Sequence, residues 1–324
     1  MATAELQKAS ARPRPARGPS TKVSAGRIAL YVTLAVISLL MVVPFIWMVL
    51  TSLKTPAEIA SQDAGLLPQH WEFGNYLDAL EAAPFATYAR NSFIIAISHT
   101  VLNVLVASMA GYSLARIRFR GSEVIFYLFI AALMIPTYTK VLPEFLIVRF
   151  MPLAGGNDIF GQGGSGWLDS WWALIVPGAV TPFAVFLFRQ FYLDLPVELE
   201  EAARLDGLGE FRIYARIMTP QVKPALTTVA LLTFESSWNN FLWPLLVTRT
   251  DSLRVIQVGL SVFKTENGTQ WHFLMAGTTL ATLPMVALPH RPALFRAGLR
   301  NCRSQVTGSG PERPVIERVI SHVC

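Results

Sequence analysis

Charged residues are scarce in this 324-residue chain, at 15% of the sequence, and cysteine occurs only twice. Typical soluble proteins carry about 25% charged residues, so the composition argues against ordinary soluble domains. Two cysteines exclude a disulfide scaffold, and a hydrophobic content of 52% excludes a chain that is disordered throughout. Because the apolar excess lies in long runs, the sequence predicts an integral membrane protein.

The chain also lacks the common motifs for nucleotide and metal binding. No GxxxxGK(S/T) motif occurs, and the Gly-rich segment 155–166 lacks the lysine of such a loop, so we interpret it as a flexible connection. CxxC and HExxH are absent, the five histidines are scattered, and no Ser/His/Asp set can be argued from spacing. We therefore expect no catalytic residues, no bound cofactor and no metal. Energy for work against a gradient must then come from a partner or from an ion.

Six apolar runs can cross a membrane as helices, since a span needs about 20 residues for roughly 30 Å of hydrocarbon. The first run is too long for a signal peptide and no small-residue cleavage site follows it, so we interpret it as an uncleaved span. The predicted spans are residues 28–50, 93–115, 124–148, 171–188, 224–247 and 273–288. They place a transmembrane domain at residues 26–288. The basic tail before it, residues 1–25, has the composition of a disordered segment.

Lysine and arginine predict the orientation of these spans, because they concentrate in cytoplasmic loops. With the N-terminus inside, the inner segments hold 20 of the 27 basic residues and the outer segments hold 6, while Lys140 lies within a span. This bias predicts that both termini are cytoplasmic. It also accounts for the net charge of +6, which we attribute to cytoplasmic loops and not to a nucleic-acid site.

The longest predicted inner loop, residues 188–226, has the pattern of a helix, a sharp turn and a second helix. Asp194 can cap the first helix, and Pro196 suits its first turn. Gly207 supplies the left-handed residue that ends it. The second helix is expected to run from Glu210 to Met218, stopping before the next proline.

One side of this first helix is suited to close approach by another protein. Ala202 and Ala203 are small, and Glu201 and Asp206 offer hydrogen-bond acceptors. The alternative is an amphipathic connector on the lipid surface. Such helices usually have a basic polar face, whereas three glutamates open this one, which favours a protein partner.

The same loop resembles the signature of permease subunits of bacterial ABC importers, in which EAA is followed by Gly, Ile and Pro at fixed spacing. The matching residues are Glu201, Ala202, Ala203, Gly207, Ile217 and Pro220. Thr219 departs from the usual leucine. Further motifs resemble the carbohydrate branch, and within it the smaller, maltose-system-like permease of a pair: NYLDAL (75–80), NSF (91–93), GYSLAR (111–116), PVELEEAARLDG (196–207) and WNNFLWPL (238–245).

The resemblance implies an all-α bundle of six transmembrane helices in the bacterial cell membrane, surrounded by lipid. It implies that the EAA segment, between spans four and five, is a coupling helix that docks on a separate ATPase subunit. The expected coupling residues are those of the signature together with Asp206. Two ATPase subunits would hydrolyse the ATP, a second permease would complete the pore, and an extracytoplasmic binding protein would deliver the sugar. The chain itself would be a transporter subunit and not an enzyme.

The fifth predicted span carries polar residues that mark a translocation path or a helix contact. An aromatic ring beside amides suits sugar binding, and charged groups inside a membrane face the bundle interior or water. The alternative is hydrogen bonding between helices, which also favours Asn and Ser. The candidate path residues are Glu235, Trp238, Asn239 and Asn240. In the second span, His99 and Asn103 share a helix face, and we interpret them as packing contacts.

The resemblance stops after Leu288, which leaves an atypical tail at residues 289–324 and a sixth span of only 16 residues. Pro289 and Pro292 oppose continuation of the helix. We interpret the tail as the product of a shifted reading frame, with a genuine divergent tail as the alternative. A membrane subunit without transport activity, because of this tail, is therefore the second hypothesis for the chain. An ion-coupled carrier is the third, but it has no use for an ATPase dock.

Overall fold

The computed structural model describes residues 25–61, 65–265 and 268–287. The chain divides into two compact units, residues 1–48 and 49–324. The described residues are mostly helical, which confirms the predicted all-α class, and a two-residue hairpin pairs β1 (Lys264–Thr265) with β2 (Gly268–Thr269). The predicted tails at 1–25 and 289–324 lie outside the described residues, apart from residue 25.

The first helix, α1 (Ala25–Ser52), contains the first predicted span. Its apolar side chains are exposed along its length, Leu40 and Met41 among them at 65% and 69%. A helix that is apolar on all sides belongs in a protein core or in a bilayer. Residues 28–52 are long and apolar enough to cross a membrane, which supports the second environment.

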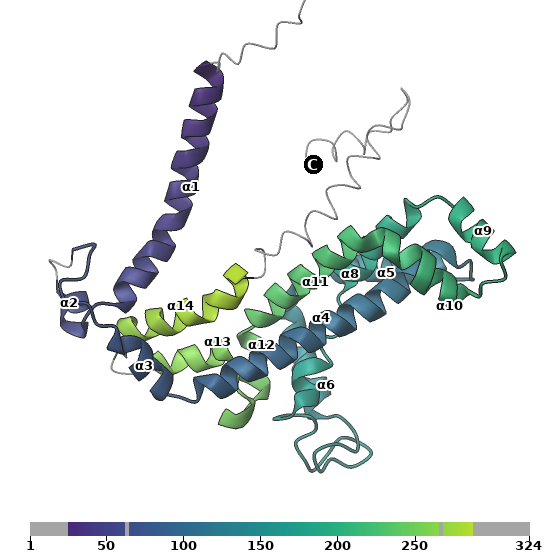
Figure 1. The fold of residues 1–324 in the computed structure, drawn as a ribbon. Coiled ribbons are helices and arrows are strands. Elements are labelled where there is room, and N and C mark those ends of the chain that lie inside the picture. The colour runs from purple at the N-terminus through teal and green to yellow at the C-terminus, as the bar shows by residue number, and fades with distance from the viewer. Residues whose placement is uncertain (1–24, 62–64, 266–267, 288–324) are drawn as a thin grey trace, which may run out of the picture. The chain divides into compact units, whose positions relative to one another are not determined.

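The longest helix, α4 (Phe85–Arg116), contains the second predicted span and organises the second unit. It packs against α8 (Pro182–Leu193) and α11 (Lys223–Trp238), which lie side by side with it in Figure 1. Gly111 is the closest point of the contact with α8. A Cβ there would lie 2.6 Å from Phe188 Cβ, so the two backbones touch only because residue 111 has no side chain.

The third predicted span is not one straight helix. It consists of α5 (Ser122–Leu133) and α6 (Thr137–Arg149), bent by 108° at a break that contains Pro136. Proline lacks an N–H and disfavours a helical residue before it, which is the physical reason for the break. Within the described ranges, two helices can cross a membrane by length and composition, or up to three if this pair is one broken span.

The fourth and fifth predicted spans are also interrupted. In the fourth, α7 (Trp171–Ile175) is separated from α8 by a turn with Pro177 and Gly178. In the fifth, α11 is separated from α12 (Leu242–Val247) by residues 239–241. The sixth corresponds to α14 (Trp271–Ala287), a helix of 17 residues. The six-span bundle and its orientation therefore remain predictions.

Short elements complete the second unit at the two ends of α4 (Figure 1). Near its first residues lie α3 (Gly74–Glu81), η3 (Asp251–Leu253) and α13 (Ile256–Gly259). The segment that connects α8 to α11 lies near the last residues of α4. The remaining short helices are α2 (Pro56–Ala60), α9 (Glu198–Leu205), α10 (Glu210–Arg212), η1 (Ile213–Met218), η2 (Thr219–Val222) and η4 (Leu260–Phe263).

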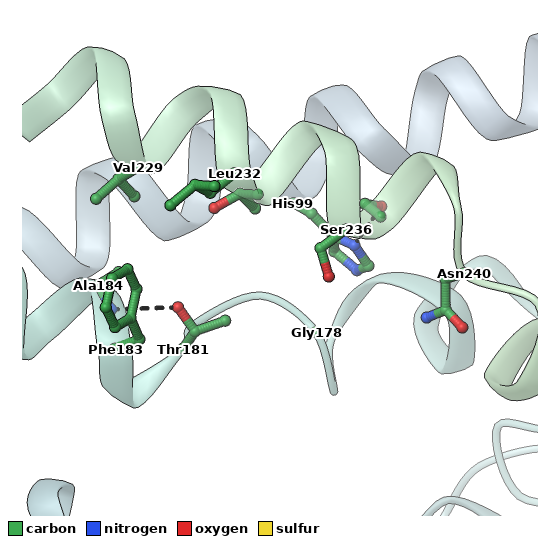
Figure 2. A pocket seen from close by; sticks show the side chains of 11 residues that line it. His99, Gly178, Thr181, Phe183, Ala184, Val229, Leu232, Ser236 and Asn240 are labelled. Carbon is green, nitrogen blue, oxygen red and sulfur yellow. Dashed lines mark hydrogen bonds between the residues drawn. The ribbon is translucent and has the colours of Figure 1, made fainter. Parts of the chain in front are cut away.

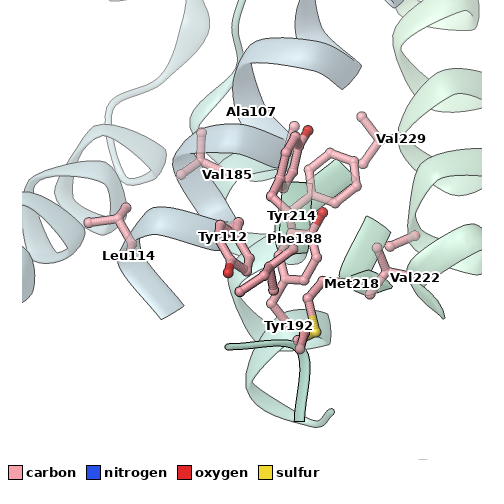
Figure 3. Packing of buried hydrophobic residues seen from close by; sticks show 14 residues of the cluster. Ala107, Tyr112, Leu114, Val185, Phe188, Tyr192, Tyr214, Met218, Val222 and Val229 are labelled. Atoms are coloured by element: carbon pink, nitrogen blue, oxygen red, sulfur yellow. The ribbon is translucent and has the colours of Figure 1, made fainter. Parts of the chain in front are cut away.

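Three clusters of buried apolar residues include parts of α4. The cluster at the α9 end joins α4, α8, α9, η1, η2 and α11, and Figure 3 shows its aromatic centre. There the ring of Tyr112 contacts those of Tyr192 and Tyr214, with ring centroids 5.4 Å apart in both pairs. Because all three clusters include residues of α4, this helix packs against every part of the core in the second unit.

Candidate functional site

The first candidate site is the elbow between α8 and α11, residues 194–222, which the sequence predicts as the coupling segment. Helix α9 begins after Val197, and three glutamates in its first turn favour the positive end of the helix dipole. Asp194 does not cap this helix, contrary to prediction. It ends α8 instead, where its backbone N–H donates to the carbonyl of Gln190 at 3.2 Å, because the chain needs two more residues to turn.

Gly207 ends α9 as predicted. Its φ of +77° is the left-handed conformation that glycine adopts without a steric cost. The N–H of Gly207 donates to the carbonyl of Arg204 at 3.0 Å, and the N–H of Leu208 donates to that of Ala203 at 3.1 Å. This pair of bonds is a Schellman motif, which satisfies the last carbonyls of the helix and turns the chain sharply.

The second predicted helix of the elbow, Glu210 to Met218, is wrong in form and in its end. The segment starts as α10 and continues as the π-helix η1 and the 3₁₀-helix η2, which leads directly into α11. Pro220 lies within η2, near its start, and does not stop the chain's helical course. A proline in the first turn of a helical segment loses no intrahelical hydrogen bond, so it is tolerated there.

The expected coupling residues divide between a buried and an exposed side of the elbow. Ala203 belongs to the core and Ile217 is half-buried, so these two position α9 and η1. The exposed members are Glu201, Ala202, Asp206, Gly207 and Pro220. Large apolar side chains join them at the surface, and the most exposed of these are Leu205 at 90% and Phe211 at 68%.

Charged groups connect the elbow to α4. The Arg116 guanidinium, at the end of α4, lies 3.5 Å from the Glu200 carboxylate of α9, and Arg204 lies 3.7 Å from the same carboxylate. Arg204 also donates to Glu210 at 3.0 Å. An open basin of about 590 Å³ lies over these residues. Burial raises the pKa of Glu200, against the attraction of the two arginines, and the negative charge of Glu210 adds to the rise.

The second candidate site lies halfway along α4, where polar side chains join helices. His99 Nδ1 lies 2.8 Å from Ser237 Oγ of α11. Asn103 donates to the hydroxyls of Thr181 and Thr233 at 3.1 and 2.8 Å, and accepts from the N–H of Thr181 at 2.9 Å. Both α4 residues are therefore buried contacts between helices, as interpreted from the sequence.

Two open cavities lie beside His99. One, of about 300 Å³, lies between α8 and α11 (Figure 2), and the other, of about 550 Å³, reaches α6 and the start of α12. Four residues line both cavities: His99, Gly178, Ser236 and Asn240. The larger one adds Tyr138 and Glu144. Hydroxyl, amide and carboxylate groups beside aromatic rings can hydrogen-bond a polyhydroxylated ligand and stack on it.

The four candidate path residues lie in the last turn of α11 or directly after it, but they do not share one role. Trp238 is buried at 2% exposure, and its indole N–H donates to the carbonyl of Ala281 at 3.0 Å. Asn240 and Asn239 line the larger cavity. Glu235 is exposed and accepts from Asn239 at 3.3 Å. Trp238 is therefore a packing residue in this structure, while the other three face outward or into the cavity.

Comparisons with known proteins bear on both sites. Residues 103–290 match the sequence model of a family described as the binding-protein-dependent transport system inner membrane component. The chain belongs to this family. The matched region contains the elbow and most of the residues that line the two cavities, but not His99, and it ends at the start of the predicted atypical tail.

The permease is similar to the arabinooligosaccharides transport system permease protein AraQ of Bacillus subtilis, at 34% identity over 272 residues, covering 83% of this chain and 92% of AraQ. It is similar to the diacetylchitobiose uptake system permease protein NgcG of Streptomyces coelicolor, at 29% identity over 78% of each chain. Its fold resembles a bacterial ABC transporter involved in import of the acidic polysaccharide alginate, with a TM-score of 0.70, 22% identity, and coverage of 83% of this chain and 95% of that chain.

These matches confirm that the chain is a permease of the carbohydrate ABC transporter family and that it is a multi-pass protein of the cell membrane. Such permeases are transport components and not enzymes. Sequence reasoning missed the contact of Arg116 with Glu200. Arg116 ends the GYSLAR motif, but no periodicity relates residue 116 to residue 200, so the contact emerges only from the fold.

Proposed function

We propose that this permease is one transmembrane subunit of an ATP-driven importer for a sugar or oligosaccharide. It forms half of the translocation pore with a second permease, and it couples through the elbow to a separate ATPase subunit. An extracytoplasmic binding protein delivers the sugar, and two ATPase subunits hydrolyse the ATP. Both termini and the elbow lie on the cytoplasmic side, in agreement with the distribution of lysine and arginine.

The observation that carries this proposal is the exposed surface of α9 and α10. Leu205 and Phe211 expose apolar surface beside the carboxylates of Glu201 and Asp206. Apolar side chains rimmed by charges are typical of a surface that another protein covers. The left-handed Gly207 and the buried Ala203 hold this side in one orientation, so the partner meets a preformed surface.

Coupling follows from rigid-body motion of the elbow. When the ATPase subunits close on ATP and reopen after hydrolysis, α9 moves with them. Because α8 enters the elbow and α11 leaves it, both helices tilt with α9. The cavity of about 300 Å³ lies between these two helices, so its access changes with their tilt. The transporter then has discrete packing states. Nucleotide bound at the cytoplasmic side and the binding protein at the outer side shift the populations of these states.

The end of α11 supplies this subunit's share of the path. A charged side chain at the centre of a bilayer costs about 2.5–3.5 kcal/mol on the insertion scale, so Glu235 faces water or a second subunit and not lipid. Asn239 and Asn240 lie next to it at the larger cavity. Their amides are suited to sugar hydroxyls. The named substrates of relatives, arabinooligosaccharides and diacetylchitobiose, belong to this chemical class.

The test is co-purification of the full chain with the ATPase and the second permease encoded beside it, followed by uptake in proteoliposomes. Labelled mono- and oligosaccharides, arabinooligosaccharides and diacetylchitobiose among them, are supplied with the adjacent binding protein. We expect a stable complex and ATP-dependent uptake of at least one sugar. Uptake driven by an ion gradient without the ATPase would contradict the proposal, as would cross-links that place the elbow outside the cell.

A further inference from the structure

Arg116, the last residue of α4, holds three parts of the elbow at once. Its guanidinium donates to the carbonyl of Tyr192 from Nε at 2.9 Å and also donates to the carbonyl of Leu195. Its Nε lies 3.5 Å from Glu200 Oε1. Tyr192 lies in the last turn of α8, Leu195 follows that helix and Glu200 lies in α9, so one side chain joins α4 to both helices that meet at the turn.

The Glu200 carboxylate, which faces Arg116, is buried although one of its oxygens has no hydrogen bond among the described residues. The Glu200 side chain is only 2% exposed, and its Oε1 has no hydrogen bond among the described residues, although Arg116 and Arg204 lie within ion-pair distance. Burial also raises the pKa of this carboxyl despite the two arginines. Desolvation therefore outweighs attraction, and a buried pair of this kind is poor evidence for stability. What the pair supplies is a fixed geometry between α4 and α9.

Helix α4 reaches from this contact to the two cavities and to the segment 252–256. At its middle, His99 lines both cavities. Near its start, Asn91 donates to the carbonyls of Ser252 and Arg254 at 2.8 and 2.9 Å, and Ser92 accepts from the N–H of Ile256 at 2.9 Å. This rod of 32 residues is thus hydrogen-bonded at its far end to the segment 252–256.

We propose that Arg116 and Glu200 are positioning residues that fasten α9 to α4, so that movement of the elbow is carried into α4 as well as into α8 and α11. Through α4 the movement reaches the cavities and the segment 252–256. The inference rests on the proposed role of α9 as the ATPase dock. It adds a third moving helix, one that is far from the elbow in sequence and that lies beside the cavities.

Arginine is required for this role because of its shape. A planar guanidinium can donate to two carbonyls and face a carboxylate together, whereas a lysine ammonium is a single point of charge. The structure offers a matched control at the same end of the unit. Arg189 of α8 donates to the carbonyl of Leu114 and to Glu123, both at 3.3 Å, and contacts no residue of α9 among its described hydrogen bonds and ion pairs.

The experiment uses the complete transporter in nanodiscs or proteoliposomes, with Arg116→Lys, Glu200→Gln and the control Arg189→Lys. The readout is sugar imported per ATP hydrolysed, together with melting temperature. We expect both test variants to assemble and hydrolyse ATP but to lose at least about fivefold in this ratio. The double variant should lose no more than the worse single variant, since both act through one contact. Arg189→Lys should keep the ratio within about twofold.

A second measurement follows the two helices directly. Spin labels at Glu198→Cys on α9 and Met109→Cys on α4, with Cys302 and Cys324 replaced by serine, report their separation. We expect one narrow distance in the wild-type background, the same with and without nucleotide, and a broad distribution after Arg116→Lys. Wild-type import per ATP in both test variants, or an equally narrow distance in Arg116→Lys, overturns the inference. Failure of the proposed function is distinct, because it removes sugar-stimulated ATP hydrolysis from the wild-type complex itself.

Discussion

The imidazole of His99 bridges α4 and α11 through Ser237, with 2.8 Å between Nδ1 and Oγ. Its other nitrogen, Nε2, lies 3.1 and 3.0 Å from the carbonyls of Leu174 and Ile175 at the end of α7. Carbonyl oxygens only accept, so Nε2 carries the proton and Nδ1 accepts from the serine hydroxyl in the neutral ring. One side chain thereby holds three helices around the cavities.

Replacing His99 by leucine should therefore loosen this junction. The change removes the partners of one hydroxyl and two carbonyls, and a buried polar group left without a partner costs about 1–3 kcal/mol. We expect a lower melting temperature of the detergent-solubilised complex. Thr227→Val is the control, because that exposed hydroxyl donates to the carbonyl of Lys223 in its own helix and joins no second helix among the described residues. Equal melting temperatures for the two variants would show that His99 does not hold the helices together.

Replacing Gly207 by valine should uncouple the elbow without preventing membrane insertion. A β-branched residue at a φ of +77° is strained, so α9 must end differently and its exposed side must turn. We expect sugar-stimulated ATP hydrolysis to be lost while the chain still inserts and binds the second permease. Gly209→Val is the matched control, since Gly209 has a φ of −75° and open space where a Cβ would lie. Normal coupling in Gly207→Val would refute the docking role.

Substitutions at Glu235 and Trp238 should have different effects, one on transport and the other on stability. Trp238→Phe keeps a ring in the core but removes the hydrogen bond to Ala281, so we expect a loss of about 0.5–1.5 kcal/mol in stability with little change in the KM for sugar. Glu235→Gln should leave the melting temperature unchanged and alter uptake. Melting curves and uptake kinetics of both variants measure these two effects. A Trp238→Phe variant of normal stability but raised KM would place the indole in the path.

The buried Glu200 carboxylate should make the elbow sensitive to pH. Burial raises its pKa, with Arg116, Arg204, Glu210 and Tyr112 as the ionisable groups around it. A carboxyl with a raised pKa binds more protons in the folded state, so its contribution to stability is full below the unfolded pKa of about 4.3 and falls as pH rises through the folded pKa.

Hydrogen exchange measures this effect in α9. After correction for intrinsic exchange rates, we expect stronger protection at pH 5 than at pH 8 in the wild type. Burial raises the pKa of Asp194 as well, so part of the difference belongs to that residue. Glu200→Gln isolates the share of Glu200, and the pH difference should shrink in this variant. An unchanged difference would assign the whole effect to other groups.

Local signals in the sequence were sufficient for the elements whose cause is local. Uninterrupted apolar runs predict α1 and α4, and the left-handed glycine predicts where α9 ends. The prediction of Asp194 as a helix cap was wrong because α9 begins later than expected: its N-cap is Val197, which follows Pro196 and makes no side-chain cap bond, while Asp194 ends α8. The bend at Pro136 has a visible cause, but a proline alone does not specify its size of 108°.

The site was predictable only where its residues are neighbours in the chain. The signature residues of the elbow and the polar end of α11 each form one segment. The contacts that unite segments, such as Arg116 with Glu200 and Asn103 with Thr181, join residues that are far apart in sequence. Hydrogen-bonding side chains at such positions indicate that a partner exists, but not which one.

The missing side chain at Gly111 constrains how the subunit can open. Because α4 and α8 touch backbone to backbone there, these two helices cannot approach each other more closely at this level. The space beside Phe183 and Val229, where α8 faces α11, is by contrast already hollow. Movement of the elbow can therefore change the spacing of α8 and α11 more readily than it can bring α4 closer to α8.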